Sequence, residues 1–323
     1  MVRLARVLLA SAELNFRQRF AFTNKDVLRW FPGHMGKGMK QIQTNLRSVD
    51  LVLEVHDARI PASGRNPQFE YSLGGVRPHI LVLNKSDLAD LTKASAIVSH
   101  LKQNEGVTDV LFTNAKDPFC KGMKRLIPTI TRLIGESDRH NRSELKEFCV
   151  MVIGVPNVGK SSIINSLRNK CLRKSSAAPV GAVAGITRSV GMKIKVSQEP
   201  LIYILDSPGI LNPRVDDVET GFKLALCSSM LDHLVGIRNI ADYLLYFLNK
   251  RQCFTYVEKL NLKEPTDSID FLLVSAAISS GKTVKRRDMA TGGYTTVPDL
   301  DRAATTFVSM FRSGGFGKFL LDD

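Results

Sequence analysis

The sequence lacks the cysteine patterns of disulfide-rich and zinc-binding proteins. Its 323 residues contain five scattered cysteines, an odd number, and no two of them are spaced as C-x-x-C. This pattern argues against a disulfide framework and a structural zinc site, and it fits a reducing compartment. The sequence also contains no apolar run of about 20 residues, the length needed to cross a bilayer. We therefore expect a soluble or peripheral protein without a transmembrane segment.

Acidic residues are outnumbered by basic ones. There are 31 acidic residues against 45 lysines and arginines, which gives a net charge of +14 and an isoelectric point near 9.7. Such a balance favours a polyanionic partner, either a nucleic acid or an anionic membrane surface. Organellar proteins are often equally basic without binding a polyanion, so the charge alone leaves both interpretations open.

The N-terminus is rich in arginine and poor in acidic residues. Residues 1–20 carry four arginines and a single acid, with leucines and valines between them. An arginine-rich, acid-poor amphipathic stretch is typical of a mitochondrial presequence, although a basic surface helix is the alternative. We expect residues 1–24 to be a presequence and the mature protein to lie in the mitochondrial matrix. Peripheral association with the matrix side of the inner membrane stays open.

The rest of the chain alternates strand-like and helix-like segments. Residues 49–59, 79–87 and 110–117 are short apolar runs that end in polar loops, and segments with helical spacing separate them. This rhythm predicts an α/β domain with a mostly parallel sheet, which we place at residues 25–214. Beyond it only helical spacing is visible, so we expect a small α-helical domain at residues 215–323.

A phosphate-binding loop follows the strand-like run that begins at residue 148. The stretch "VMVIGVPNVGKSS" matches G-x-x-x-x-G-K-[ST] between a predicted strand and a predicted helix. Its glycines let backbone N–H groups surround the phosphates, while Lys160 should reach the β- and γ-phosphates and Ser161 should ligate Mg²⁺. The residues assigned to this loop are Gly154, Asn157, Val158, Gly159, Lys160, Ser161 and Ser162.

The sequence "ILDSPG" supplies the element expected to sense the γ-phosphate. Asp206 is placed to hold the Mg²⁺ shell, and the Gly209 N–H should face the γ-phosphate. Between this element and the phosphate loop lies "GAVAGITRS", where Thr187 is the best candidate for a switch threonine that closes on Mg²⁺. A threonine in a loop of small residues is, on its own, more often an ordinary loop residue.

Two loops are candidates for reading the base. An ionised Asp87 in "NKSD" can accept hydrogen bonds from the ring N–H and exocyclic amine of guanine, whereas adenine presents an unprotonated ring nitrogen. In "TNAKD" the Ala115 N–H could donate to the guanine O6, and Lys116 could flank the base. The candidate residues are Asn84, Lys85, Ser86, Asp87, Asn114, Ala115 and Lys116.

The order of these motifs carries a family resemblance. Both base-reading loops precede the phosphate loop, which resembles the order of the circularly permuted GTPases. Within that group "WFPGHMGKGM" (30–39), "DARIP" (57–61) and "GRNP" (64–67) look like the ribosome-biogenesis GTPase A subfamily. The resemblance implies hydrolysis of GTP to GDP and phosphate with Mg²⁺, and a large ribosomal subunit as partner. Together with the expected presequence, it points to a mitochondrial member of the subfamily.

The resemblance also bears on how hydrolysis occurs. A conventional small GTPase has glutamine after "DSPG", but here the residue is Ile210, which cannot orient water. His34 matches the subfamily position implicated in hydrolysis, and a neutral imidazole could orient the water. Asn157 matches the asparagine that helps related GTPases hold K⁺ beside the phosphates. A structural role for His34 in the first helix is the alternative.

Three functions fit the sequence to different degrees. The first is a GTP-hydrolysing assembly factor for the mitochondrial large ribosomal subunit, slow until the subunit stimulates it, that supports mitochondrial ribosome biogenesis and translation. The second is a GTP-gated rRNA-binding module that blocks premature subunit joining, with hydrolysis incidental. The basic cluster at Lys282–Arg287 suits rRNA contact but equally suits a solvated face. A metabolic kinase leaves Asp87 unexplained, and we expect no DNA partner.

Overall fold

The computed structural model describes residues 16–22, 33–66, 69, 77–104, 107, 109–139, 144–172, 193–211, 217–287 and 292–322. The chain divides into two compact units. The nucleotide unit contains residues 24–236 and 310–323, and the helical unit contains residues 237–309 together with the N-terminal residues up to Thr23. Thr187 lies outside the described residues.

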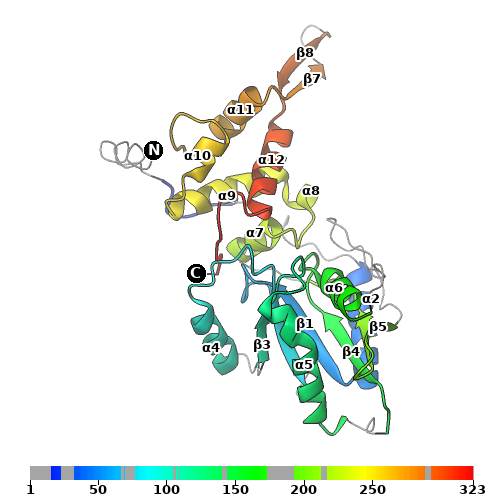
Figure 1. Ribbon diagram of the computed structural model, residues 1–323. Coiled ribbons are helices and arrows are strands. Elements are labelled where there is room, and N and C mark those ends of the chain that lie inside the picture. The colour runs from blue at the N-terminus through cyan, green and yellow to red at the C-terminus, as the bar shows by residue number, and fades with distance from the viewer. Residues whose placement is uncertain are drawn as a thin grey trace. The chain divides into compact units, whose positions relative to one another are not determined.

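A six-stranded sheet forms the centre of the nucleotide unit (Figure 1). Its strands are β1 (Leu51–Asp57), β2 (His79–Asn84), β3 (Asp109–Phe112), β4 (Phe148–Ile153), β5 (Lys193–Ser197) and β6 (Ile202–Asp206). They lie in the order β3-β2-β1-β4-β6-β5, and only β5 is antiparallel to its neighbour. The predicted mostly parallel α/β sheet is confirmed.

The chain changes direction across the sheet between β1 and β4. From β1 the chain builds outward through β2 to β3, and it then returns to place β4 on the other side of β1. Ligands of open α/β sheets bind outside the carboxyl ends of the strands at such a switch point. The phosphate loop follows β4 and the "DARIP" loop follows β1, so both meet at this point.

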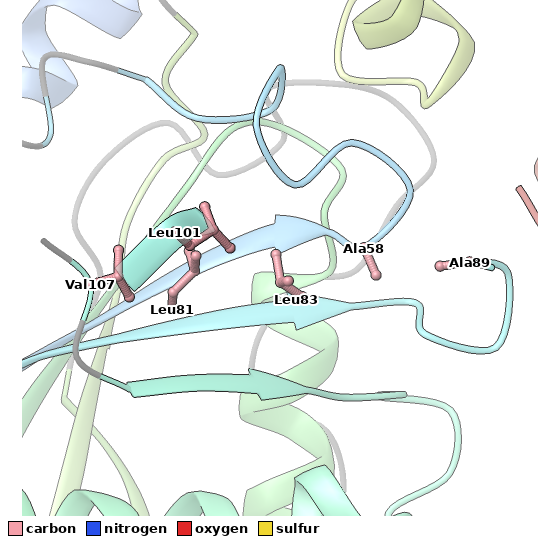
Figure 2. Close-up of a cluster of buried hydrophobic side chains, with 6 residues drawn as sticks. All are labelled: Ala58, Leu81, Leu83, Ala89, Leu101 and Val107. Carbon is pink, nitrogen blue, oxygen red and sulfur yellow. The ribbon is translucent and has the colours of Figure 1, made fainter. Parts of the chain in front are cut away.

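Helices cover the sheet and bury its apolar side chains. The helical segments in the described part of the nucleotide unit are α2 (Gly33–Asn45), η3 (Leu46–Ser48), α4 (Ala94–Asn104), α5 (Lys121–Gly135), α6 (Lys160–Leu172), α7 (Val218–Leu226) and α8 (Asp232–Val235). Figure 2 shows one cluster in the core, where Leu101 of α4 lies against Leu81 of β2 beside Val107. All the side chains of β1 are buried, as expected of a central parallel strand.

The helical unit is not built of helices alone. It contains α9 (Ile237–Lys250), α10 (Thr255–Lys259), α11 (Ile269–Ser279), the antiparallel pair β7 (Thr283–Arg287) and β8 (Tyr294–Pro298), and α12 (Leu300–Arg312), whose last residues belong to the nucleotide unit. Helical spacing led us to expect helices only. The difference has a local cause, since threonine and valine in "TVKRR" and "YTTVP" favour strands. No described helix is both long and apolar enough to cross a bilayer.

The division of the chain also differs from the expected boundary at residue 214. Residues 217–236 and 310–322 belong to the nucleotide unit, where Arg312 donates to the carbonyl oxygen of Ala225 at 2.8 Å and pairs with Asp232 at 2.7 Å. The sequence pattern identifies α7 as a helix, but it does not show which surface the helix covers. Long-range contacts of this kind decide the boundary.

Part of the expected presequence belongs to the helical unit. Arg17 lies 2.7 Å from Asp242 and 3.0 Å from Asp267, and the ring of Phe20 packs edge-on against Tyr243 with centroids 5.2 Å apart. Residues 16–22 thus contact α9 and the loop that precedes α11, and we call this segment the strap. The expected presequence of residues 1–24 would include this strap.

Candidate functional site

The phosphate loop requires glycine at two positions. Gly154 has φ of +145°, and a Cβ there would lie 2.2 Å from the carbonyl oxygen of Val55. Gly159 has φ of +98°, and a Cβ there would lie 2.3 Å from the Asn84 side-chain nitrogen. Any side chain at either position would both strain the backbone and collide with a neighbouring strand end or loop. The glycines predicted from the motif are therefore dictated by contacts with β1 and β2.

Lys160 lies at the start of α6 and turns back on the loop. Its Nζ donates to the carbonyl oxygens of Gly154 at 3.2 Å and Val155 at 2.8 Å, and the residue is 7% exposed. Burial lowers the pKa of Lys160 to about 8, although Asp206 opposes the shift. An anionic phosphate would supply the negative charge that this buried ammonium needs.

Asp206 and Ser161 lie together where the sequence predicts a magnesium site. The Ser161 hydroxyl donates to Asp206 Oδ2 at 3.0 Å, while Oδ1 of the same carboxylate is buried without a hydrogen-bond partner among the described residues. Burial raises the pKa of Asp206, and the charge of Lys160 opposes this only in part. A buried carboxylate oxygen without a donor fits a hard cation. Asp206 and Ser161 would hold Mg²⁺, which neutralises charge on the β- and γ-phosphates.

The γ-phosphate element packs directly on the phosphate loop. A Cβ on Gly209 would lie 2.6 Å from Cα of Pro156, and the Ile210 N–H donates to the Gly154 carbonyl at 3.2 Å. On the other side, a Cβ on Gly38 of α2 would lie 2.7 Å from the Pro208 ring. The "DSPG" element is thus held between α2 and the phosphate loop.

Asn84 joins both candidate base-reading loops to the phosphate loop. Its side-chain nitrogen donates to the Val158 carbonyl at 2.8 Å, and its Oδ1 accepts from the Ala115 N–H at 3.1 Å and from the Thr113 hydroxyl at 3.2 Å. The Ser86 N–H also donates to the Thr113 carbonyl at 3.0 Å. Three motifs that are far apart in the sequence therefore share one side chain at the carboxyl ends of β2, β3 and β4.

This arrangement agrees with comparisons to known proteins. A family profile described as "50S ribosome-binding GTPase" matches residues 149–274. "Mitochondrial GTPase 1" of Aedes aegypti is 54% identical over 309 residues, with 95% of this chain and 98% of that protein covered. "Mitochondrial ribosome-associated GTPase 1" of Bos taurus is 50% identical over 320 residues, with coverage of 98% and 95%. The chain belongs to the mitochondrial GTPase 1 family.

Solved structures agree on the fold of this GTPase. GNP-bound YlqF from T. maritima matches with a TM-score of 0.54 and 25% identity over 89% of this chain and 99% of that one. Its GDP-bound structure matches with the same TM-score and 23% identity, covering 87% and 98%. The circular permutation inferred from the motif order is confirmed, and the protein is a P-loop GTPase.

Sequence reasoning missed two charged residues of this GTPase. Asp57 ends β1, and its Oδ2 lies 3.0 Å from Lys85 Nζ and 2.8 Å from the Arg59 guanidinium. Burial alone would raise the pKa of Asp57, but Lys85 and Arg59 more than offset it and hold the pKa well below its usual range. Lys85 itself adopts φ of +57°. The sequence signal that could have identified them is the pair of charged residues in "DARIP", at the end of an apolar run that predicts a buried strand.

The structure brings most of the predicted residues together at the carboxyl edge of the sheet. The group consists of Asn84, Lys85, Ser86, Asp87, Asn114, Ala115, Lys116, Gly154, Asn157, Val158, Gly159, Lys160, Ser161, Ser162, Asp206 and Gly209. The Ala115 N–H is donated to Asn84 here, so a contact with guanine O6 stays a prediction. The Asn157 side chain donates to the Ser228 carbonyl at 2.9 Å. Position 34 lies on α2, one turn before Gly38.

Proposed function

We propose that this GTPase is an assembly factor for the large subunit of the mitochondrial ribosome, acting in the matrix and supporting mitochondrial ribosome biogenesis and translation. The observation that carries the proposal is similarity over nearly the full length to proteins named "Mitochondrial ribosome-associated GTPase 1", at 50% identity in Bos taurus and 52% in Xenopus tropicalis. The family profile, which is described by binding to the 50S subunit, supports the same kind of partner.

Hydrolysis in this proposal depends on His34 and not on the residue after "DSPG". Ile210 at that place is fully buried and apolar, so it cannot orient the attacking water. His34 is on α2, the helix that packs against Pro208 through Gly38, which supports a place near the γ-phosphate. We expect slow intrinsic turnover, since unassisted switch GTPases run at about 10⁻⁴ to 10⁻² per second.

Two ions complete the proposed catalytic centre. Mg²⁺ is assigned to Ser161, Thr187 and Asp206, and K⁺ to Asn157. Asn157 has φ of +59° in the phosphate loop, a conformation that asparagine tolerates better than most residues. K⁺ would supply positive charge beside the phosphates in place of an arginine. Replacing K⁺ by Na⁺ should slow hydrolysis without weakening GDP binding, and equal rates in both salts would remove K⁺ from the proposal.

The β7–β8 hairpin is the proposed rRNA contact. All five residues of β7 are exposed, and Lys285 and Arg287 point to the same face because they are two residues apart. Arg287 lies opposite Tyr294 on the neighbouring strand. Tyr294 is 75% exposed and can stack on a base. A two-stranded hairpin is marginal in water unless something covers it. A cationic face with an accessible aromatic ring is complementary to RNA.

The same hairpin is what favours the second candidate, a GTP-gated rRNA-binding module whose hydrolysis is incidental. The test is GTP hydrolysis in K⁺ buffer with and without purified mitochondrial large subunits, for the wild type, His34→Ala and the control Gln41→Ala, an exposed position on the same helix. Stimulation lost only in His34→Ala supports the assembly GTPase. Tight GTP and subunit binding without stimulation supports the binding module and overturns the catalytic proposal.

A further inference from the structure

The last residues of the chain return to the nucleotide unit and bond to two of its loops. The Phe319 N–H donates to the Leu88 carbonyl at 3.2 Å, and the Leu321 N–H donates to the Arg59 carbonyl at 2.8 Å. Leu88 follows Asp87 in the base-reading loop, while Arg59 lies in the "DARIP" loop. We call residues 311–322 the C-terminal clamp. Both of its backbone bonds join it to loops at the carboxyl edge of the sheet.

Asp322 at the end of the clamp binds the second half of the "DARIP" loop. Its carboxylate accepts from the N–H groups of Ala62 and Ser63, each at 2.8 Å, and from the Ser63 hydroxyl. Lys223 of α7 lies 3.4 Å from the same carboxylate and balances its charge. A carboxylate that accepts several hydrogen bonds from one loop restricts the position of that loop.

Buried apolar side chains anchor the clamp. The guanidinium of Arg59 lies over the ring of Phe311 at 5.4 Å, and Phe311 stacks on Phe319 at 5.7 Å. Phe316 and Leu321 are buried as well. Because these side chains are removed from water, the clamp is held by packing in addition to its backbone bonds.

A chain of contacts leads from the clamp to the base-reading residues. Arg59 is 2% exposed and donates to Asp57 through its Nε at 2.9 Å and its Nη2 at 2.8 Å. Asp57 in turn pairs with Lys85 of "NKSD". The Leu88 N–H donates to the Lys85 carbonyl at 2.9 Å, which closes a turn around Asp87. The clamp is therefore linked to this turn by two routes. One is the direct bond to Leu88, and the other runs through Arg59 and Asp57 to Lys85.

We propose that the C-terminal clamp positions Asp87 for guanine recognition. This proposal rests on the assignment of Asp87 as the guanine-reading carboxylate. Two oxygens of one carboxylate pair with the ring N–H and the exocyclic amine only if the turn that carries them is held in place. The Leu88 carbonyl is the first backbone acceptor after Asp87, so the Phe319 N–H fixes the end of that turn. Residues of the clamp are positioning residues, since none of them needs to touch the nucleotide.

A matched pair of variants isolates the decisive bond in the full-length chain. Phe319→Pro removes both the ring and the N–H that Leu88 accepts, whereas Phe319→Ala removes the ring alone. Asp322→Ala releases Ala62 and Ser63 at the other end of the clamp. Lys318→Ala, at the exposed position directly before Phe319, is the control. The measurements are dissociation constants for GDP and for inosine diphosphate, which lacks the exocyclic amine, together with nucleotide-free melting temperatures.

The expected result is a change in base selectivity. Phe319→Pro should bind GDP about tenfold more weakly than Phe319→Ala, because the lost hydrogen bond misplaces the Asp87 carboxylate. Its preference for GDP over inosine diphosphate should also shrink, because the misplaced carboxylate no longer accepts well from the exocyclic amine. Asp322→Ala should show the same trend to a smaller degree, and Lys318→Ala none. Unchanged selectivity in Phe319→Pro and Asp322→Ala would overturn the proposal, even if both variants melt earlier.

Asp87→Asn separates this inference from its premise. If Asp87→Asn loses GDP while the clamp variants keep full selectivity, the guanine assignment holds and the clamp proposal is wrong. If Asp87→Asn binds GDP normally, the premise itself has failed.

Discussion

The two units of the molecule differ in how deeply they bury charged side chains. In the nucleotide unit charged side chains are buried at the strand ends, as in the pair of Asp57 and Arg59, whose side chains are 0% and 3% exposed. In the helical unit the described ion pairs are more exposed, as in Arg238 and Asp301 at 40% and 61% and in Arg17 and Asp242 at 34% and 24%. Burying a charge costs stability unless partners compensate it, whereas exposed charges cost little.

This difference in charge burial suggests that the two units suit different kinds of ligand. A buried charge beside a rigid loop suits a ligand of fixed shape, and Lys160 beside the predicted phosphate loop is an example. An exposed cationic hairpin fits a large and variable surface such as folded RNA. The contrast makes separate predictions for the two units: nucleotide-unit variants should change nucleotide affinity or stability strongly, and helical-unit variants should do so weakly.

Lys160→Ala should sharpen the comparison most. Removing the ammonium eliminates charge-assisted bonds to the phosphates, so GTP affinity should fall at least about 100-fold. The nucleotide-free protein should melt no earlier than the wild type, because burial already lowers the pKa of Lys160 and makes its charged form costly. Nucleotide titration and thermal melting check this, with the exposed Lys170→Ala on the same helix as control. A strong loss of free-protein stability would contradict it.

Glu54→Ala tests the cost of a buried charge outside the predicted nucleotide site. The carboxylate is fully buried 2.7 Å from His56 Nε2, 2.8 Å from His79 Nε2 and 3.3 Å from Arg65. Removing it leaves basic groups uncompensated, so unfolding free energy should fall by about 3–5 kcal/mol. Urea unfolding measures this, and a loss below 1 kcal/mol would contradict it.

The same carboxylate makes a pH dependence predictable. Burial would raise the pKa of Glu54, but His56 and His79 hold it well below its usual range. Its stabilisation is therefore present above the unfolded-state pKa and is lost as pH falls through the folded-state pKa. Glu54→Gln, which does not titrate, should lose less stability than the wild type between neutral and acidic pH. An equal loss in both proteins would assign the acid sensitivity to other groups.

The parts of the nucleotide unit that the sequence predicts are those with a local pattern. The phosphate loop combines an apolar strand, spaced glycines and a helix start, all within residues 148–172, and the sheet follows from apolar runs of strand length. The bond between Asn84 and Val158 joins residues 74 positions apart, so no local pattern contains it. The clamp is an extreme case, since Asp322 and Ala62 are 260 positions apart.

The helical unit was harder to predict for a related reason. The hairpin has exposed side chains on all of β7, so it lacks the alternation of buried and exposed residues that identifies a strand. The strap lies within the expected presequence, since its arginines and apolar residues suit both a presequence and a folded segment. Its contacts with Asp242 and Asp267 join residues more than 220 positions apart, so no local pattern contains them.

The double variant Lys285→Ala/Arg287→Ala should separate the two units functionally. We expect RNA affinity to fall about tenfold and the salt dependence of binding to decrease by about 1.5 in log–log slope, since two phosphate contacts are lost. GDP affinity and melting temperature should not change. Lys259→Ala/Lys263→Ala removes the same charge from exposed positions of the same unit. An equal loss of RNA affinity in this control would show that net charge, and not the hairpin, binds RNA.

Arg17→Ala should have the smallest effect and tests whether the helical unit needs its strap. Arg17 is about one-third exposed in both of its ion pairs, so its removal should cost about 1 kcal/mol of unfolding free energy. Arg19→Ala, an exposed arginine two residues away, is the control and should cost nothing measurable.

The strap also makes the processing of the N-terminus testable. Because the ion pairs with Asp242 and Asp267 exist only if Arg17 is retained, we expect cleavage before Phe16, and N-terminal sequencing of the protein from mitochondria decides it. A mature chain starting at residue 25 would lack the strap. The two carboxylates would then lack their arginine, and the helical unit would lose the contacts that Arg17 and Phe20 make with it.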